Sequence, residues 1–433
     1  MNAAVARLRT AWRDRAFLRH LTVLMSGTAI AQAASLLAAP LLTRLYSAAD
    51  FGTFGVFLSI AAILGVVAGA RLELTLALPD EPSVAANLLA VNLVAIAAVA
   101  SLATALLLTF EGPLVAFVND PAIAPWIPWI PVSVALIGLF QAFTYQSIRD
   151  ERFGVLAGAR ITRTLTTVSL QGLLGLLPAG VVGLVGGHVT GQAVGSASLV
   201  LRSWRTTVAA LRRSVSLPAM RDAAREYVDF VRFGAPQALL NSVSQNVPAL
   251  VLAALFGPTY VGWYLLAHRV LVLPVNLLSG TFKEAFLARV RTAQREDGDV
   301  FALYLRAVLG FAAVVTIPFL LVMAFGPSLF AFVLGAQWEA SGIYAQWLAV
   351  GMWIGSMNAP AIVMTQVLRK QRWLMTYDAL LLVLRVGALL VVGTQVGDVA
   401  AIAAYALVGA AFNLVLLIAM GAFTHGARRT AAL

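Results

Sequence analysis

Arginines stand inside long apolar stretches of this 433-residue chain, where charge is costly. Arg269 lies in the middle of YLLAHRVLVLP, and Arg385 lies in the middle of LLLVLRVGALL. Arg71 and Arg163 occur a few helical turns from the ends of similar stretches. An arginine at the centre of a membrane-spanning helix costs about 2.5–3.5 kcal/mol and usually faces a protein interior or a hydrated cavity. Because guanidinium groups bind phosphate through paired charge-assisted hydrogen bonds, these four arginines are candidate anion-binding residues.

Uncharged polar residues accompany these arginines in the apolar stretches. The run QALLNSVSQNVPAL places Asn241 and Gln245 one helical turn apart, Gln32 lies in the first stretch, and Tyr145 follows Gln141 by one turn. Amides and aromatic rings suit a hydroxyl-rich ligand such as a sugar. Hydrogen bonding between helices explains each of these residues equally well.

Structural roles also compete with binding roles for the arginines. Arg71 is two residues from Glu73, and Arg385 follows Asp378 by two helical turns, so either acid could neutralise a neighbouring arginine. Arg71 and Arg163 could instead extend their side chains to the lipid headgroups.

The motifs of soluble enzymes are absent from the sequence. There is no GxxxxGK phosphate loop, no HExxH pair and no cysteine, and the four histidines are far apart. We therefore expect no metal, no cofactor and no catalytic activity.

The apolar content points to a membrane protein. Apolar residues make up 61% of the chain and charged residues 11%, with a mean hydropathy of +0.88. A spanning helix needs about 20 apolar residues, and the sequence predicts an all-α fold with about twelve spans. They lie at 21–43, 53–76, 84–109, 126–147, 154–177, 180–201, 231–255, 260–282, 302–325, 340–367, 374–394 and 398–422.

The basic residues are distributed asymmetrically around these spans. Of the 30 lysines and arginines, 27 lie near alternate ends, which predicts that both termini are cytosolic in a bacterial inner membrane. This bias accounts for the net charge of +11 without nucleic acid, and it favours contact with anionic membrane lipids.

The longest polar interruption divides the spans into two groups of six. The predicted parts are a cytosolic segment 1–20, a first lobe 21–201, a basic linker 202–230, a second lobe 231–422 and a cytosolic tail 423–433. When the sequence is compared with itself at an offset of 210 positions, four residues align with identical or similar ones: Leu45, Tyr46, Gly52 and Phe54 with Leu255, Phe256, Gly262 and Tyr264. Two parallel repeats of six spans would form two lobes around a central cavity.

Small residues and prolines mark helix contacts and bends. Gly183, Gly187, Gly191 and Gly195 recur every four residues in the sixth span, which predicts close packing against another helix. Prolines, which permit bends, occur inside or at the ends of spans at Pro40, Pro128, Pro131, Pro236, Pro248, Pro274, Pro318 and Pro360.

Three segments resemble the bacterial Wzx-type polysaccharide-repeat flippases, which belong to the multidrug/oligosaccharidyl-lipid/polysaccharide exporter superfamily. They are PLLTRLYSAADFGTFGVFLSI (40–60), ARLELTLALPD (70–80) and APQALLNSVSQNVPALVLAALFGPTYVGWYLLAHRVLVLP (235–274). The resemblance implies alternating-access translocation of an undecaprenyl-pyrophosphate-linked oligosaccharide for O-antigen, capsule or exopolysaccharide synthesis. It assigns Arg71 and Arg269 to the substrate cavity. A polymerase and a chain-length regulator are the implied partners.

Two other functions remain open at this point. A multidrug exporter of the same superfamily would favour an acidic cavity, whereas the charges inside these spans are mostly arginines. An integral-membrane polysaccharide polymerase would need a sizeable outer loop with catalytic basic residues, and no predicted outer loop exceeds about 20 residues.

Overall fold

The computed structural model describes residues 26–431 apart from 178, 297 and 369, and this part of the chain consists of helices and short connections. The predicted segment 1–20 lies outside the described residues. Among the described helices, nine are long and apolar enough to cross a membrane. The predicted all-α membrane fold is confirmed, and the chain is a multi-pass membrane protein.

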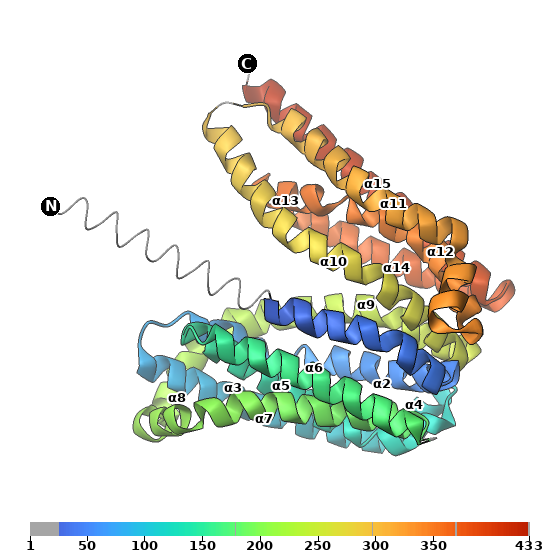
Figure 1. Ribbon diagram of the computed structural model, residues 1–433. Helices are drawn as coiled ribbons and strands as arrows, with labels where there is room; N and C mark the ends of the chain where they lie inside the picture. Colours follow the sequence, from blue (N-terminus) through green and yellow to red (C-terminus); the bar gives the residue numbers. More distant parts are fainter. Residues whose placement is uncertain (1–25, 178, 297, 369, 432–433) are drawn as a thin grey trace. The chain divides into compact units, whose positions relative to one another are not determined.

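The helices follow one another through short turns (Figure 1). After a first helix Ser26–Leu45, the α-helices are α2 (Ala48–Gly65), α3 (Pro82–Thr109), α4 (Glu111–Val118), α5 (Trp129–Arg149), α6 (Phe153–Leu176), α7 (Val181–Ser214), α8 (Leu217–Glu226), α9 (Ala235–Phe256), α10 (Pro258–Arg295), α11 (Val300–Leu334), α12 (Glu339–Ser356), α13 (Ala359–Val367), α14 (Gln371–Gln395) and α15 (Asp398–Ala431). Shorter helical turns are η1 (Leu72–Ala77), η2 (Pro121–Trp126), η3 (Phe230–Gly234) and η4 (Ala336–Trp338).

Three predicted spans are helical but more polar than the nine. They correspond to α6, α7 and α10, which are 24, 34 and 38 residues long. All three helices are long enough to cross a membrane. They differ from the nine only in their more polar composition. Helix α7 continues through Ser214 and is followed by α8, so much of the basic segment 202–230 is helical.

Two predicted spans are interrupted rather than continuous. The second stops at the end of α2 and resumes as η1, because Ala70 (φ 52°) and Arg71 (φ 64°) adopt left-handed backbone conformations. The tenth divides into α12 and α13 around Met357 and Asn358, and Pro360 stands in the first turn of α13. Pro360 lies at this break, whereas Pro248 and Pro318 lie inside the continuous helices α9 and α11. Non-helical backbone at membrane depth is tolerated where protein or water covers it.

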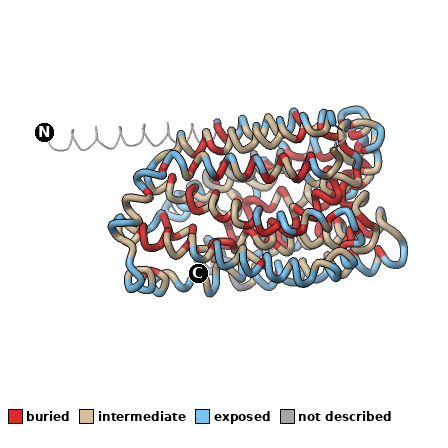
Figure 2. Tube along the Cα trace, turned by 90° about the horizontal axis from the view of Figure 1, so that it is seen from below, coloured by how far each residue is buried: buried red, intermediate tan, exposed pale blue. Residues whose placement is uncertain are grey.

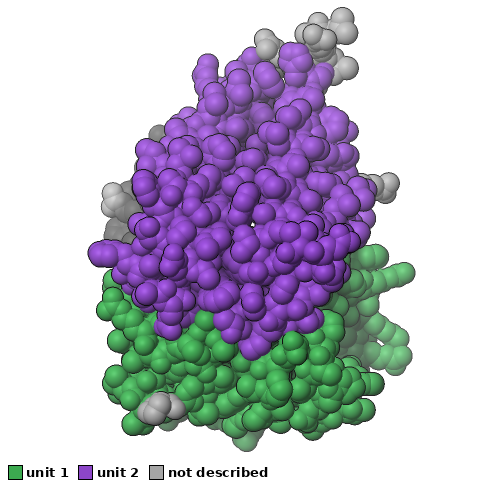
Figure 3. Space-filling model, turned by 90° about the vertical axis from the view of Figure 1, so that its right-hand side faces the viewer, with its two compact units in different colours: residues 1–247 green, residues 248–433 purple. Residues whose placement is uncertain are grey.

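The chain divides into two compact units, residues 1–247 and 248–433 (Figure 3). We call them unit 1 and unit 2. Along most helices buried positions are interspersed with exposed ones (Figure 2). The core of unit 1 includes Leu88 and Leu156, and that of unit 2 includes Met364 and Met420. Each unit therefore has its own apolar interior.

The glycines of α7 pack against α6, as predicted. A Cβ at Gly187 would lie 2.6 Å from Cγ of Gln171, and a Cβ at Gly191 would lie 2.9 Å from the carbonyl oxygen of Arg163. Tyr46 donates a hydrogen bond of 2.6 Å to the carbonyl of Gln171 in the same region. Burial, with a smaller contribution from Asp50, raises the pKa of Tyr46 to about 12, so this hydroxyl remains a donor at neutral pH.

Candidate functional site

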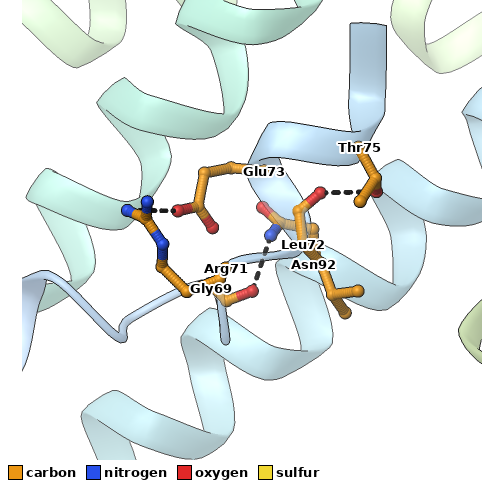
Figure 4. Close-up of polar contacts among 6 residues, drawn as sticks. All are labelled: Gly69, Arg71, Leu72, Glu73, Thr75 and Asn92. Atoms are coloured by element: carbon orange, nitrogen blue, oxygen red, sulfur yellow. Dashed lines mark hydrogen bonds and ion pairs between the residues drawn. The ribbon is translucent and has the colours of Figure 1, made fainter. Parts of the chain in front are cut away.

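The break between α2 and η1 carries an ion pair whose carboxylate is buried and whose guanidinium is partly exposed (Figure 4). Nη1 of Arg71 lies 3.6 Å from Oε1 of Glu73; the Arg71 side chain is 25% exposed and that of Glu73 is 2% exposed. Asn92 of α3 donates a hydrogen bond of 2.9 Å to the carbonyl of Gly69. A Cβ at Gly69 would lie 2.5 Å from Nδ2 of Asn92 and 2.6 Å from Oε2 of Glu73, so this close arrangement requires glycine.

Several polar atoms of this cluster have no hydrogen-bond partner. Both carboxylate oxygens of Glu73, Oδ1 of Asn92 and Nε of Arg71 are buried without a hydrogen-bond partner. Tyr145 of α5 is half-buried against the apolar core of unit 1. Buried polar atoms without partners are uncommon and often mark sites that hold water or a ligand. Arg71 is thus both a structural partner of Glu73 and partly accessible.

A second cationic group of unit 1 lies on α6. The guanidinium of Arg163 stands 5.0 Å from the ring centre of Phe140 in α5. Its aliphatic stem lies against Gly195 of α7, where a Cβ would come within 2.7 Å of Cβ of Arg163. One turn earlier, Arg160 donates a hydrogen bond of 2.8 Å to Oγ1 of Thr28 in the first helix.

The predicted amide residues of unit 1 have contrasting surroundings. Gln32 is half-buried, and its Oε1 is buried without a hydrogen-bond partner. Asn241 and Gln245 lie one turn apart on α9, as predicted, and both are exposed. Their neighbour Ser242 is buried and donates to the carbonyl of Ala62 at 3.2 Å. One face of α9 therefore packs within unit 1, while the face bearing Asn241 and Gln245 is accessible.

In unit 2, Arg385 lies on α14 and its side chain packs against α15. Its guanidinium stands 4.9 Å from the ring centre of Tyr405, and a side chain at Gly409 would overlap it. Its Nε is buried without a hydrogen-bond partner. Among the described residues no carboxylate lies within ion-pairing distance of Arg385, so Asp378 is not the neutralising partner that the sequence allowed.

Arg269 has different surroundings from Arg385. It is exposed on α10, whereas Ala267 and Leu271 beside it are buried. Within unit 2 the arginine therefore lies on an accessible side of the helix.

A polar network that the sequence did not predict joins four helices of unit 2. Asn358, at the break between α12 and α13, donates to Oδ1 of Asn413 at 2.8 Å, and Nδ2 of Asn413 donates to the carbonyl of Gly351 at 3.3 Å. Tyr377 donates to the same Oδ1 at 3.5 Å. An asparagine inside an apolar span, such as Asn413 or Asn92, is the sequence signal that could have identified both buried clusters.

The described residues contain no group of three histidines or acids that could hold a metal ion. Unit 1 brings Arg71, Tyr145, Arg163 and Gln32 into one compact body, and unit 2 contains Arg269 and Arg385. In chemical terms both units present guanidinium groups that can bind oxyanions.

Solved transporter structures share this fold. An inward-facing multidrug resistance MATE family transporter of the MOP superfamily is 14% identical, with a TM-score of 0.70 over 95% of this chain and 100% of that chain. The lipid II flippase MurJ in an inward closed conformation is 10% identical, with a TM-score of 0.63 over 92% and 87%. A MOP superfamily transporter from Pyrococcus furiosus Vc1, with a binding pocket of reverse polarity that suggests a different function, is 15% identical, with a TM-score of 0.50 over 96% of each chain.

Comparison with curated proteins gave no match. At these low identities the solved structures establish the fold alone. The sequence family described as polysaccharide biosynthesis protein matches residues 41–343, which is more than half of the chain. The chain therefore belongs to this polysaccharide biosynthesis family and has the fold of the MOP transporters.

Proposed function

We propose that this protein translocates an undecaprenyl-pyrophosphate-linked oligosaccharide repeat unit from the cytoplasmic to the periplasmic leaflet of the inner membrane. The repeat unit would serve the synthesis of O-antigen, capsule or exopolysaccharide. The observation that carries this proposal is that half-buried arginines of the spans, Arg163 and Arg385, have no carboxylate partner among the described residues. Such cations are costly in a membrane unless an anion or water compensates them.

The chemistry of the sites matches the two parts of such a substrate. Arginines suit the pyrophosphate, with Arg269 as an exposed contact and Arg71, Arg163 and Arg385 as half-buried ones. Asn241, Gln245, Gln32 and Tyr145 suit the sugar hydroxyls. The two repeats would alternately open the substrate path to the two leaflets while the lipid tail stays in the bilayer.

The membrane potential can supply the driving force. An interior-negative potential moves an anionic headgroup outward with about 2.3 kcal/mol per charge per 100 mV. The transported species would be a lipid-linked oligosaccharide in contact with membrane lipids, and a polymerase and a chain-length regulator would take up the product. No catalytic role is proposed for the chain.

Two observations support this function over its alternatives. The polysaccharide biosynthesis family favours a sugar-linked cargo over a drug, and MurJ, of similar fold, is a lipid II flippase. A carrier of cationic drugs would gain from acidic spans, whereas the only ion pair between described side chains leaves Arg163 and Arg385 uncompensated. A polymerase would be an enzyme, and the similar solved structures are transporters.

The test is transport by purified protein in vesicles that contain a fluorescent undecaprenyl-pyrophosphate oligosaccharide. We expect protein-dependent flipping, and Arg269→Ala should slow it strongly at equal protein level. Arg212→Ala, at the exposed end of α7, is the matched control and should transport normally. Export of cationic drugs without flipping would favour the multidrug alternative, and full transport by Arg269→Ala would remove Arg269 from the substrate path.

A further inference from the structure

Two half-buried arginines, one in each half of the chain, contact a glycine of the following helix. Arg163 lies on α6, the fifth predicted span, and its side chain contacts Gly195 of α7, the sixth. Arg385 lies on α14, the eleventh, and its side chain contacts Gly409 of α15, the twelfth. In each half the fifth and sixth helices pack against each other. Each half thus has an arginine of its fifth helix against a glycine of its sixth, although the offset of 210 positions does not align the two pairs.

Each glycine leaves the space that its arginine occupies. A Cβ at Gly195 would lie 2.7 Å from Cβ, 3.1 Å from Cγ and 3.2 Å from Cδ of Arg163, so the stem of the arginine fills this space. A Cβ at Gly409 would overlap the guanidinium of Arg385 itself. Any larger residue would therefore move the arginine. Gly186 of α7 and Gly387 of α14, by contrast, have no such neighbour within 4 Å.

An aromatic ring holds each guanidinium from another side. Phe140 of α5 lies 5.0 Å from Arg163, and Tyr405 of α15 lies 4.9 Å from Arg385. The rings come from different helices, so the correspondence between the halves is limited to the arginine and the glycine. A ring face stabilises a cation without neutralising it. Each arginine is thus fixed in place by neutral groups and keeps its positive charge.

The surroundings leave the charge available to an anion. Among the described side chains no carboxylate lies within 4 Å of either arginine, and Nε of Arg385 has no hydrogen-bond acceptor. Both side chains are half-buried rather than sealed. Their guanidinium groups can pair with oxyanions in the forked geometry that phosphate prefers.

We propose that each half of the chain carries one oxyanion seat, formed by Arg163 with Gly195 and by Arg385 with Gly409, and that each seat binds a phosphate group. The glycines act as positioning residues for the arginines. This inference rests on the proposed function only for the identity of the natural ligand, a lipid-linked diphosphate. Binding of inorganic pyrophosphate tests the seats separately from transport.

The experiment is site-resolved arginine modification of the full-length protein in detergent. Phenylglyoxal reacts with accessible guanidinium groups, and peptide mass spectrometry reports the rate at each arginine with and without inorganic pyrophosphate. We expect pyrophosphate to slow modification of Arg163 and Arg385 and to leave the exposed Arg205 and Arg212 unchanged. Equal rates with and without pyrophosphate at Arg163 and Arg385, or no reaction there at all, would overturn the proposal. This comparison needs no variant.

Variants then test the glycines. Gly195→Ala should abolish protection of Arg163 and leave that of Arg385, and Gly409→Ala should do the reverse. The matched controls Gly186→Ala and Gly387→Ala should keep both. If Gly195→Ala and Gly409→Ala are folded and keep full protection, the positioning role is wrong. Protection without lipid flipping would retain the seats and reject the proposed function, whereas flipping without protection would reject the seats alone.

Discussion

Replacing Arg71 with alanine tests the ion pair at the break between α2 and η1. The change leaves the Glu73 carboxylate 2% exposed, with neither of its oxygens hydrogen-bonded and no other cation within 4 Å among the described residues. At 3.6 Å the pair attracts by about 4–5 kcal/mol with an effective dielectric constant of 20. Because Arg71 is 25% exposed, solvent screens part of this attraction.

We therefore expect Arg71→Ala to destabilise the protein by about 2–3 kcal/mol, somewhat below the 3–5 kcal/mol that breaking a fully buried pair costs. Most of the loss should come from the uncompensated carboxylate rather than from the missing arginine. Glu73→Gln removes that charge, and the glutamine side chain has nearly the same size as the glutamate side chain. The double variant Arg71→Ala with Glu73→Gln should thus recover at least half of the lost stability.

The assay is reversible unfolding of the purified protein in detergent, with Arg205→Ala as the control because Arg205 is exposed on α7. The control should stay within about 0.5 kcal/mol of the parent, as is usual for surface changes. If the double variant is as unstable as Arg71→Ala, or less stable, the loss does not come from a buried charge. Arg71 would then stabilise the break through packing or through its backbone.

Two further changes test the packing of unit 2. Gly342→Ala should destabilise by about 1–3 kcal/mol in the same unfolding assay, since its Cβ would lie 2.5 Å from the carbonyl oxygen of Gly326, whereas Gly310→Ala, which meets open space, should be neutral. Equal effects of the two would contradict a close crossing of α11 and α12. Asn413→Leu should cost about 1–3 kcal/mol, because it removes the acceptor for Asn358 and leaves that buried amide unpaired. A neutral Asn413→Leu, measured alike, would show that water replaces the bond.

The sequence predicted that the long elements are helices, and nine described helices are apolar enough to cross a membrane, whereas α6, α7 and α10 are more polar and two expected spans are interrupted. It also predicted the packing of Gly183, Gly187, Gly191 and Gly195, since a four-residue period places them on one helix face. Proline positions alone did not locate the break, because Pro360 begins a new helix while Pro248 and Pro318 lie inside α9 and α11.

Features that depend on another part of the chain could not be predicted in this way. Nothing in the residue types of Ala70 and Arg71 signals a left-handed backbone. The pairing of Arg71 with Glu73, rather than of Arg385 with Asp378, depends on the break between α2 and η1. The residues around Gly409 do not indicate its role, because that role depends on the side chain of Arg385, 24 positions earlier on α14.

The polar spans explain how the chain can keep charge at membrane depth. Helices α6, α7 and α10 are the long helices between residues 26 and 431 that fall outside the nine apolar spans, and they carry Arg163, Gly195 and Arg269. A helix that lipid solvates poorly must be covered by protein or by water. The glycines of α7 allow α6, which carries Arg163, to pack closely against α7, so that protein surrounds this side of α6. Arg269 of α10 is exposed, so water or an anionic headgroup can reach it.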